Sequence, residues 1–342
     1  MAPRDRFTRA DAKAWAAENF EGVCNVIIPS YSTDLTSLNE AGIRHDVRRN
    51  IELGFWGALL VSEAGTTPAE MRTFMEIAVD EAAGRQYFVL HGSFDTLRST
   101  LAVAADARAI GVDALLMAYP NSFHPGTAGE LSDYTRAVCE GCDLAVVLFC
   151  APHFNFGRLD RSGFPLAVWD ELVGIDNVVA LKYEVGQPGV VGTWQCFERF
   201  RDRGVLVCDP HEPNLVMWAD RYDTPWVGTS NYEYYGAAVP EIFDLVRRGR
   251  RDEALERYWA LQPAREVRTA LSAQMAGANF LHRYLWKYQA WLQGYNGGPL
   301  RAPAMKLTDG QMAQVAAGLL RSGLIDHEPA SFGDFFVGRN PS

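Results

Sequence analysis

Residues 178–184 read VVALKYE, an apolar run with a single lysine near its end. The run has the length of a β-strand, and it lacks the apolar–polar alternation of a half-exposed strand, which is typical of strands buried on both faces. Runs of the same kind occur seven more times, at 22–29, 55–61, 86–92, 113–120, 144–152, 204–210 and 224–230. The sequence therefore predicts eight buried strands.

Amphipathic segments separate these runs. In residues 67–83 the apolar side chains recur at helical spacing, and Thr67 followed by Pro68 is a helix-start signal. A strand followed by a helix, repeated along the chain, predicts parallel βα units. We expect these units to close into a (β/α)8 TIM barrel, an α/β fold, over residues 21–236.

The ends of the chain differ from this pattern. Residues 1–20 form a polar N-terminal extension, and residues 237–342 read as a C-terminal helical region. Helices are expected over 237–262, 274–292 and 308–322. No linker rich in Ser, Gly or Pro separates this region from the barrel, so we expect it to pack on the barrel as a helical appendage.

Composition excludes several classes of partner. The 342 residues carry 32 basic and 42 acidic side chains, a net charge of −10, which argues against nucleic acid or a membrane surface as partner. No apolar stretch of about 18 residues is present to span a bilayer. The polar N-terminus and six cysteines without metal-like spacing favour a cytoplasmic location with reduced thiols and no bound cofactor or metal.

Lys182 stands out among the four lysines because it alone lies in a buried run. Burial disfavours the charged ammonium, and a neutral amine attacks a carbonyl carbon to form an imine. Lys182 also comes at the C-terminal end of its strand, where barrel enzymes keep their chemistry. The alternative is a structural lysine that forms an ion pair with Glu184 or Glu63.

Several segments, in order, resemble the dihydrodipicolinate synthase / N-acetylneuraminate lyase family over about residues 20–325. The matching segments are 57–65 (GALLVSEAG), 118–125 (AYPNSFHP), 146–152 (VVLFCAP), 177–182 (NVVALK) and 297–303 (GGPLRAP). The resemblance implies that Lys182 is the Schiff-base lysine of a class I aldolase. It also implies a homo-oligomer, a tetramer or dimer.

The departures from the family pattern lie at the positions that move protons. Phe149 replaces a relay tyrosine and has no hydroxyl to transfer a proton. Glu63 and Ala64, just before Gly65, replace threonines that serve the relay and the keto-acid carboxylate. Ser122 replaces a second tyrosine. Ordinary dihydrodipicolinate synthase activity is therefore not expected.

Glu63 is the candidate replacement for the missing relay. Partial burial would raise its pKa toward neutrality and let it act as general acid and base. The competing interpretation is that Glu63 neutralises Lys182 or an arginine. A carboxylate here also repels a substrate carboxylate, which argues against a pyruvate-like substrate. Further candidates for proton transfer or substrate binding are His91, His153, His211, Tyr183 and Asn231.

Two short segments, Lys182-Tyr183 and 210–212 (PHE), resemble the aromatic hydratase-aldolase branch of the family. Enzymes of that branch cleave aryl-substituted unsaturated keto acids to an aromatic aldehyde and pyruvate, although the branch retains the tyrosine that Phe149 replaces. The sequence thus predicts a Schiff-base lyase acting through Lys182 on a small carbonyl compound.

Two alternatives stay open. The first is a metal-dependent barrel enzyme whose ligands would be Glu63, His91, Asp209 and His211 at successive strand ends. The second is a non-catalytic relative that binds a carbonyl compound without imine chemistry, for which the loss of the relay hydroxyl at Phe149 is the argument.

Overall fold

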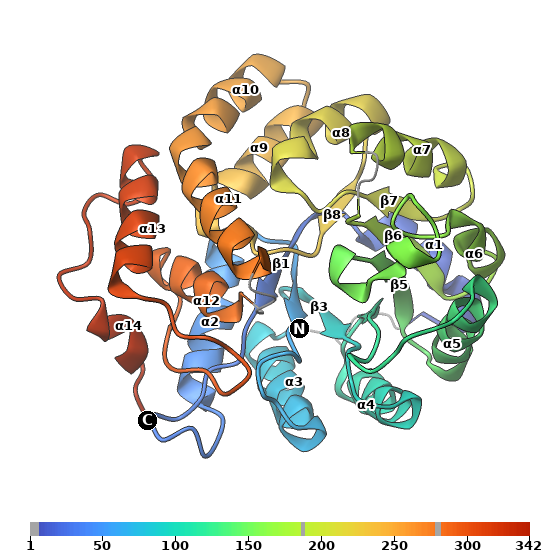
Figure 1. Cartoon of the computed structure of the whole chain (residues 1–342), viewed down its shortest axis with the longest axis horizontal. Coiled ribbons are helices and arrows are strands. Elements are labelled where there is room, and N and C mark those ends of the chain that lie inside the picture. Colours follow the sequence, from blue (N-terminus) through green and yellow to red (C-terminus); the bar gives the residue numbers. More distant parts are fainter. Residues whose placement is uncertain (1–6, 186–188, 278–281) are drawn as a thin grey trace.

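The computed structural model describes residues 7–185, 189–277 and 282–342. Eight parallel strands pair in the order β7-β6-β5-β4-β3-β2-β1-β8, and β7 also contacts β8, so the sheet is a nearly closed barrel (Figure 1). The strands are β1 (Gly22–Ile27), β2 (Gly57–Leu60), β3 (Tyr87–His91), β4 (Ala114–Met117), β5 (Ala145–Cys150), β6 (Val178–Tyr183), β7 (Leu206–Cys208) and β8 (Trp226–Gly228). Each strand lies inside its predicted run, so the predicted barrel is confirmed.

In strands β2 to β5, alternate side chains enter two different apolar layers. In β5, Val147 and Phe149 face the barrel interior, whereas Val146 and Leu148 pack under the surrounding helices. Both layers are buried, which is why the strands show no polar alternation. The same alternation turns Lys182 of β6 into the barrel.

A ring of helices covers the outside of the sheet. It consists of α2 (Glu40–Glu52), α3 (Pro68–Ala82), α4 (Leu97–Ile110), α5 (Ala128–Gly141), α6 (Leu166–Leu172), α7 (Val190–Phe200), α8 (Leu215–Tyr222) and α9 (Ala238–Arg247). Helix α3 begins where predicted, because the Thr67 side chain accepts the Glu70 N–H and Glu70 caps the Thr67 N–H in return. Helix α9 packs on α8 and β1 and completes the ring.

The C-terminal helices are α10 (Arg251–Ala260), α11 (Gln262–Gly277), α12 (Arg283–Leu292), α13 (Asp309–Arg321) and α14 (Gly333–Val337). The helix predicted over 237–262 is divided into α9 and α10 because Gly249 takes a positive φ of 73°. The prediction over 274–292 covers the end of α11 and all of α12, and its residues 278–281 lie outside the described part. Figure 1 shows α11 to α14 on one side of the barrel, beside α2.

The N-terminal segment lies at the opposite end of the barrel from Lys182. Helix α1 (Ala12–Asn19) contacts β5 and β6, and Phe20 packs on Trp56 and Trp226, which stand at the starts of β2 and β8. The described residues also form five short 3₁₀ helices: η1 (Arg9–Asp11), η2 (Pro152–Phe154), η3 (Phe156–Arg158), η4 (Glu212–Asn214) and η5 (Tyr232–Tyr235). No described helix is both long and apolar enough to cross a membrane.

Candidate active site

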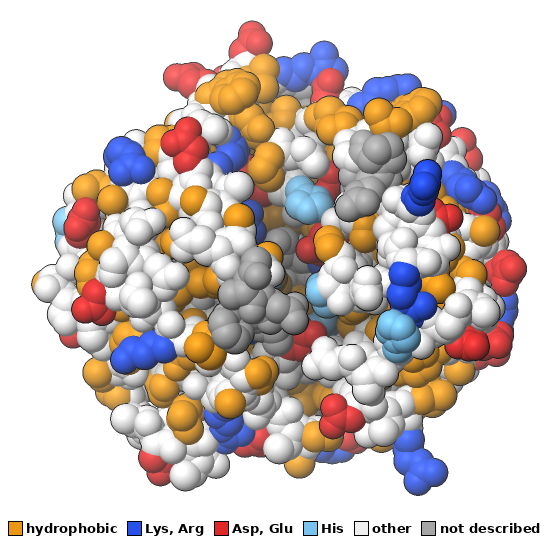
Figure 2. Space-filling model, in the orientation of Figure 1, with side chains coloured by type: hydrophobic (Ala, Val, Ile, Leu, Met, Phe, Trp, Pro, Cys, Tyr) orange, Lys and Arg blue, Asp and Glu red, His pale blue; other side chains and the backbone are white. Residues whose placement is uncertain are grey.

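A cavity of about 430 Å³ opens at the C-terminal ends of the strands. Figure 2 shows histidine and acidic side chains in the hollow at the centre of this face. Strand residues such as Val26, Leu59, Val61 and Leu116 form its apolar floor. Its polar lining comprises Glu63, His91, His153, Lys182, Glu184, Thr229, His282 and Arg283.

Lys182 lies at the inner end of this cavity, with only 4% of its surface exposed. Its Nζ is 3.0 Å from Oε2 of Glu184 and 4.0 Å from the centre of the Phe149 ring. Phe149 is the neighbour of Lys182 in the β5–β6 register. The aromatic face therefore takes the place of the missing hydroxyl and stabilises positive charge on the nitrogen.

Glu184 follows β6 and lies two residues beyond Lys182, so both side chains point to the same side of the chain. Burial raises the pKa of the Glu184 carboxyl, but Lys182 and His211 lower it to about 2 overall. At neutral pH a carboxylate is thus in contact with the amine, and 31% of its side chain stays open. The ion pair that was the structural alternative for Lys182 is present, yet both of its members line the cavity.

Glu63 is held by an arginine from the C-terminal helices. Its Oε2 accepts a hydrogen bond from Nη2 of Arg283 in α12, and Ser93 Oγ lies 3.4 Å from Oε1. Burial raises the pKa of Glu63, but His91 and Arg283 lower it to about 2. The expectation of a raised pKa is therefore wrong, because burial brings Glu63 an arginine partner. The competing interpretation, that Glu63 neutralises an arginine, is confirmed.

Three histidines lining the cavity are neutral at pH 7. Burial lowers the pKa of His91 to about 4, and the Nδ1 of His91 lies 3.2 Å from Oγ of Ser62. Burial also lowers the pKa of His153, and burial together with Arg283 lowers that of His282 to about 3. A neutral imidazole can accept a proton during a reaction, but it contributes no charge to the lining of the cavity.

His211 lies beside this group rather than in the cavity lining. Its Nδ1 is 2.6 Å from Oδ1 of Asp209, whose other oxygen accepts hydrogen bonds from Trp218 Nε1 at 2.9 Å and Asn214 Nδ2 at 2.7 Å. Burial lowers the pKa of His211, but the Asp209 contact outweighs it and raises the pKa overall. Asp209 and His211 thus form a hydrogen-bonded pair near Glu184.

Four of the predicted substrate-binding residues lie away from the cavity. Tyr183 faces outward, and its hydroxyl lies 3.4 Å from the Ser162 carbonyl oxygen, because it follows the inward-facing Lys182 on the strand. Ser122 is exposed in the loop before α5. Ala64 and Gly65 follow Glu63 and do not line the cavity. The Ala64 carbonyl oxygen accepts a hydrogen bond from the Tyr31 hydroxyl at 3.0 Å.

Asn231 is a fifth such residue, and its position has a packing cause. It is fully buried between the barrel and the C-terminal helices, where its Nδ2 donates to Gln289 Oε1 at 2.9 Å and its Oδ1 accepts from Arg268 at 2.5 Å. Both partners belong to helices beyond residue 260. Asn231 therefore ties η5 to the appendage instead of contacting the cavity.

Among the polar and aromatic residues of the cavity, four were not found from the sequence, and Glu184 was considered there only as an ion-pair partner of Lys182. Thr229 follows β8, while His282, Arg283 and Trp286 lie at the start of α12. Arg283 and Trp286 are three residues apart on the helix, with the guanidinium carbon 4.5 Å from the indole centre. The spacing is a weak signal by itself, since only the packing of α12 over the barrel mouth brings these side chains to Lys182.

The metal-ligand hypothesis finds no support in the described geometry. The Glu63 carboxylate pairs with Arg283, and the Asp209 carboxylate pairs with His211. Within residues 7–185, 189–277 and 282–342, no group of three or more His, Cys, Asp or Glu side chains is arranged to hold a metal ion.

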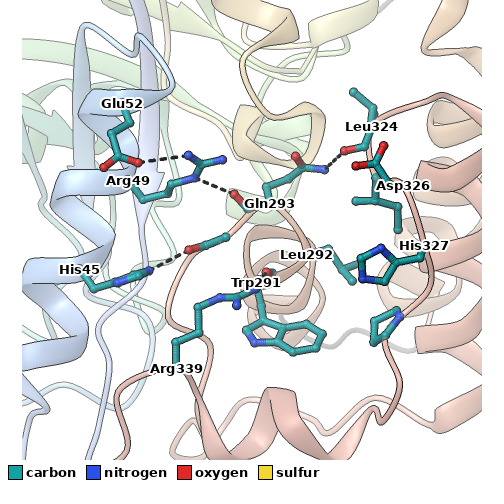
Figure 3. A pocket seen from close by; sticks show the side chains of 13 residues that line it. His45, Arg49, Glu52, Trp291, Leu292, Gln293, Leu324, Asp326, His327 and Arg339 are labelled. Atoms are coloured by element: carbon teal, nitrogen blue, oxygen red, sulfur yellow. Dashed lines mark hydrogen bonds and ion pairs between the residues drawn. The ribbon is translucent and has the colours of Figure 1, made fainter.

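A second cavity of about 680 Å³ lies between α2 and the C-terminal segments (Figure 3). His45 Nε2 is 2.8 Å from the Gly294 carbonyl oxygen, and Arg49 Nε donates to the Gln293 carbonyl at 2.8 Å. No lysine is among the described residues that line it. The polar side chains here join α2 to the appendage.

An inward-facing lysine at the end of β6, lining a cavity at the mouth of a (β/α)8 barrel, is the arrangement of class I aldolases. The chain belongs to the dihydrodipicolinate synthetase family, whose sequence model matches residues 19–317. This family includes dihydrodipicolinate synthases and N-acetylneuraminate lyases, which are class I aldolases that work through a Schiff base.

Individual relatives are distant. The 4-hydroxy-tetrahydrodipicolinate synthase of Methanopyrus kandleri is 28% identical over 136 residues, 39% of this chain and 45% of that enzyme. The corresponding match in Methanothermobacter thermautotrophicus covers 56% of the enzyme, so the chain spans about half the length of these two relatives. An uncharacterized DapA-like lyase of Pyrobaculum neutrophilum is 29% identical over 319 residues, 89% of this chain and 99% of that one.

Solved structures agree on the fold. The N-acetylneuraminate lyase of Fusobacterium nucleatum superposes with a TM-score of 0.71 at 19% identity, over 88% of this chain and 98% of that chain. At this identity the likeness extends to the barrel and its appendage and not to the substrate.

Proposed function

We propose that this protein is a Schiff-base lyase that acts on a carbonyl compound through Lys182. One observation carries the proposal: the Lys182 amine lines a cavity at the barrel mouth with the Glu184 carboxylate 3.0 Å away. The amine is the nucleophile, and the carboxylate is the proton acceptor in reach of it.

The steps follow from these two groups. Glu184 takes a proton from the Lys182 ammonium, and the free amine adds to the carbonyl carbon. Glu184 then returns this proton to the former carbonyl oxygen, and afterwards carries a second proton from the nitrogen to the same oxygen, which leaves as water. The nitrogen keeps the third proton of the original ammonium, so the product is the protonated imine, and Glu184 is again a carboxylate. This cation faces the Phe149 ring, whose centre is 4.0 Å from the nitrogen.

The protonated imine then accepts the electron pair of the bond that breaks. Cleavage needs a base for the departing group's proton, and His153 is a neutral imidazole lining the same cavity. Because Phe149 carries no hydroxyl, this route uses a carboxylate and an imidazole in place of the tyrosine relay. Glu63 in this scheme is the partner of Arg283 rather than a general acid.

A finer candidate within the proposal is a hydratase-aldolase acting on an aromatic keto acid. Phe149 and Trp286 supply aromatic walls on which an aryl group can pack. The carboxylate of such a substrate would have to compete with Glu63 for Arg283. A non-catalytic binding protein is the second candidate, for which the absent hydroxyl at Phe149 is the argument.

The remaining expectations are also proposals. From the family we propose a homo-oligomer, a tetramer or dimer, located in the cytoplasm, with a small carbonyl compound and not nucleic acid or membrane as its partner. Sedimentation velocity of the purified chain tests the oligomer, and a single monomer species at micromolar concentration contradicts it.

The test of the proposed function is trapping. The protein is incubated with keto acids, ketones and aromatic aldehydes plus sodium borohydride, and the modified peptide is identified by mass. We expect an adduct on Lys182 that is absent from Lys182→Ala. Lys287 is a matched internal control, because it is also buried and its pKa is lowered to about 8, yet it lies outside the cavity. Equal labelling of Lys287, or none of Lys182, refutes the proposal.

A further inference from the structure

The cavity around Lys182 is balanced in charge before any substrate enters. Its two cationic side chains each have a carboxylate partner inside the cavity, since Lys182 pairs with Glu184 and Arg283 pairs with Glu63. The carboxylates of both pairs are ionised at neutral pH. Neither cation of the described lining is therefore left to neutralise a substrate carboxylate.

The other polar groups do not change this balance. His91, His153 and His282 are neutral at pH 7 because burial disfavours their charged forms. His211 and Asp209 beside the cavity form a pair of their own. The segments 186–188 and 278–281 read GQP and ANFL in the sequence, so neither contains a charged residue.

Glu63 also places a negative charge inside the cavity. Its side chain belongs to the cavity lining and is 9% exposed. A substrate anion placed there meets a buried negative charge in a medium that screens charge less than water does.

What the cavity does offer is hydrogen-bonding groups without a partner and apolar walls. Among the described residues, Thr229 Oγ1 and Arg283 Nε are buried without a hydrogen-bond partner. Both residues line the cavity, together with Trp286 and Phe149. An uncharged oxygen on the substrate can satisfy Thr229 or the Arg283 Nε–H without separating Arg283 from Glu63.

We infer that the imine-forming substrate is a neutral carbonyl compound, an aldehyde or ketone with an apolar or aromatic body and no ionised carboxylate. Glu63 then excludes keto acids, including the aromatic keto acid of the finer candidate above. The inference rests on the proposed function, because it names the substrate class of the same lysine. The imine step is unchanged: water leaves, and the cation that forms keeps Glu184 as its partner.

The experiment compares compounds that differ by one charge. Wild-type protein is incubated at pH 7 with phenylpyruvate or with its neutral amide, and likewise with pyruvate or pyruvamide, plus sodium cyanoborohydride to reduce the imine. The trapping rate on the Lys182 peptide is divided by the rate of the same compound with a free lysine derivative, which removes differences in intrinsic reactivity. We expect the neutral member of each pair to react about 100-fold faster after this correction.

Two variants then test the role of Glu63. Glu63→Gln removes the negative charge and frees Arg283, so we expect the preference for the amide to fall about 100-fold. Glu70→Gln is the matched control, because Glu70 also pairs with an arginine, Arg301 at 2.8 Å, but outside the cavity, and glutamine keeps its capping role. In Glu70→Gln, the ratio of the corrected trapping rates of amide and keto acid should equal the ratio in wild type.

The outcomes separate the inference from the function on which it rests. Trapping of the keto acid at Lys182 as fast as its amide overturns the inference and leaves the Schiff-base function in place. An unchanged preference in folded Glu63→Gln overturns the assignment of Glu63 as the excluding group. No adduct on Lys182 with either member of any pair overturns the proposed function, and the inference with it.

Discussion

The Glu63–Arg283 pair gives the sharpest test of the site's structure. Arg283→Met keeps much of the apolar stem of the side chain but removes the cation from a carboxylate that is 9% exposed. A buried carboxylate without its partner is strongly destabilising, typically by about 3–5 kcal/mol. We therefore expect a large loss of unfolding free energy from a substitution at the mouth of the barrel, far from its apolar core.

The magnitude can also be obtained from the titration of Glu63. Its pKa falls from the ordinary 4.5 to about 2 in the folded protein. At about 1.4 kcal/mol per pKa unit, this corresponds to about 3 kcal/mol, which is shared among Arg283 and the histidines His91 and His153 that also lower the pKa. Because the folded-state pKa is depressed, the contribution is complete above the unfolded value of about 4.5 and is lost as the pH falls toward about 2.

The assay is urea unfolding of wild type, Arg283→Met and the double variant Glu63→Met/Arg283→Met. At pH 7 we expect the single variant to lose about 3 kcal/mol and the double variant to recover most of it, since apolar replacement of a whole buried pair is often neutral. The difference in unfolding free energy between wild type and Arg283→Met should become smaller as the pH falls below 4.5.

An exposed pair supplies the control for this assay. Arg257 and Glu241 form an ion pair on the surface, with 55% and 46% of their side chains exposed. Arg257→Met should therefore lower the unfolding free energy by less than about 1 kcal/mol. If Arg283→Met costs no more than Arg257→Met, or if the double variant is less stable than the single one, Glu63 is not the buried, paired carboxylate described above.

Three other predictions concern the chemistry. Glu184→Gln should lower turnover of any trapped substrate by about 100-fold or more, because the amide cannot accept the Lys182 proton; an unchanged kcat refutes this role. Asp209→Asn should lower the pKa of His211, which the Asp209 contact raises, and the imidazole resonances followed by NMR against pH report this directly; an unmoved titration contradicts it. A chelator should leave trapping at Lys182 unaffected, whereas its loss would revive the metal-dependent alternative.

The fold was predictable from the sequence because its determinants are local. Each buried strand is a short apolar run, and each run is bounded by turn residues and an amphipathic helix, so the eight βα units can be found without knowing their neighbours. The start of α3 at Thr67 and Pro68, and the start of α13 at Thr308, are encoded in capping signals of three or four residues.

Part of the site could also be predicted from a short stretch of sequence. A lysine in an apolar run at a strand end is unusual enough to identify Lys182, and the strand alternation that turns it inward also places Tyr183 outside and Glu184 inside. Tyr183 was therefore an avoidable error, since a period of two along the strand excludes it once Lys182 is placed in the cavity.

By itself, then, the sequence determined the barrel, the position of Lys182 at the end of a strand and the phenylalanine at position 149. Only the tertiary structure decided the electrostatics: Arg283, 220 residues from Glu63 along the chain, pairs with it, so that no cation among the described residues of the cavity is left unpaired. The physical reason is that a pKa depends on the groups that burial brings within a few ångströms. A local sequence pattern cannot show which arginine lies at the mouth of the barrel, because the packing of α12 determines it.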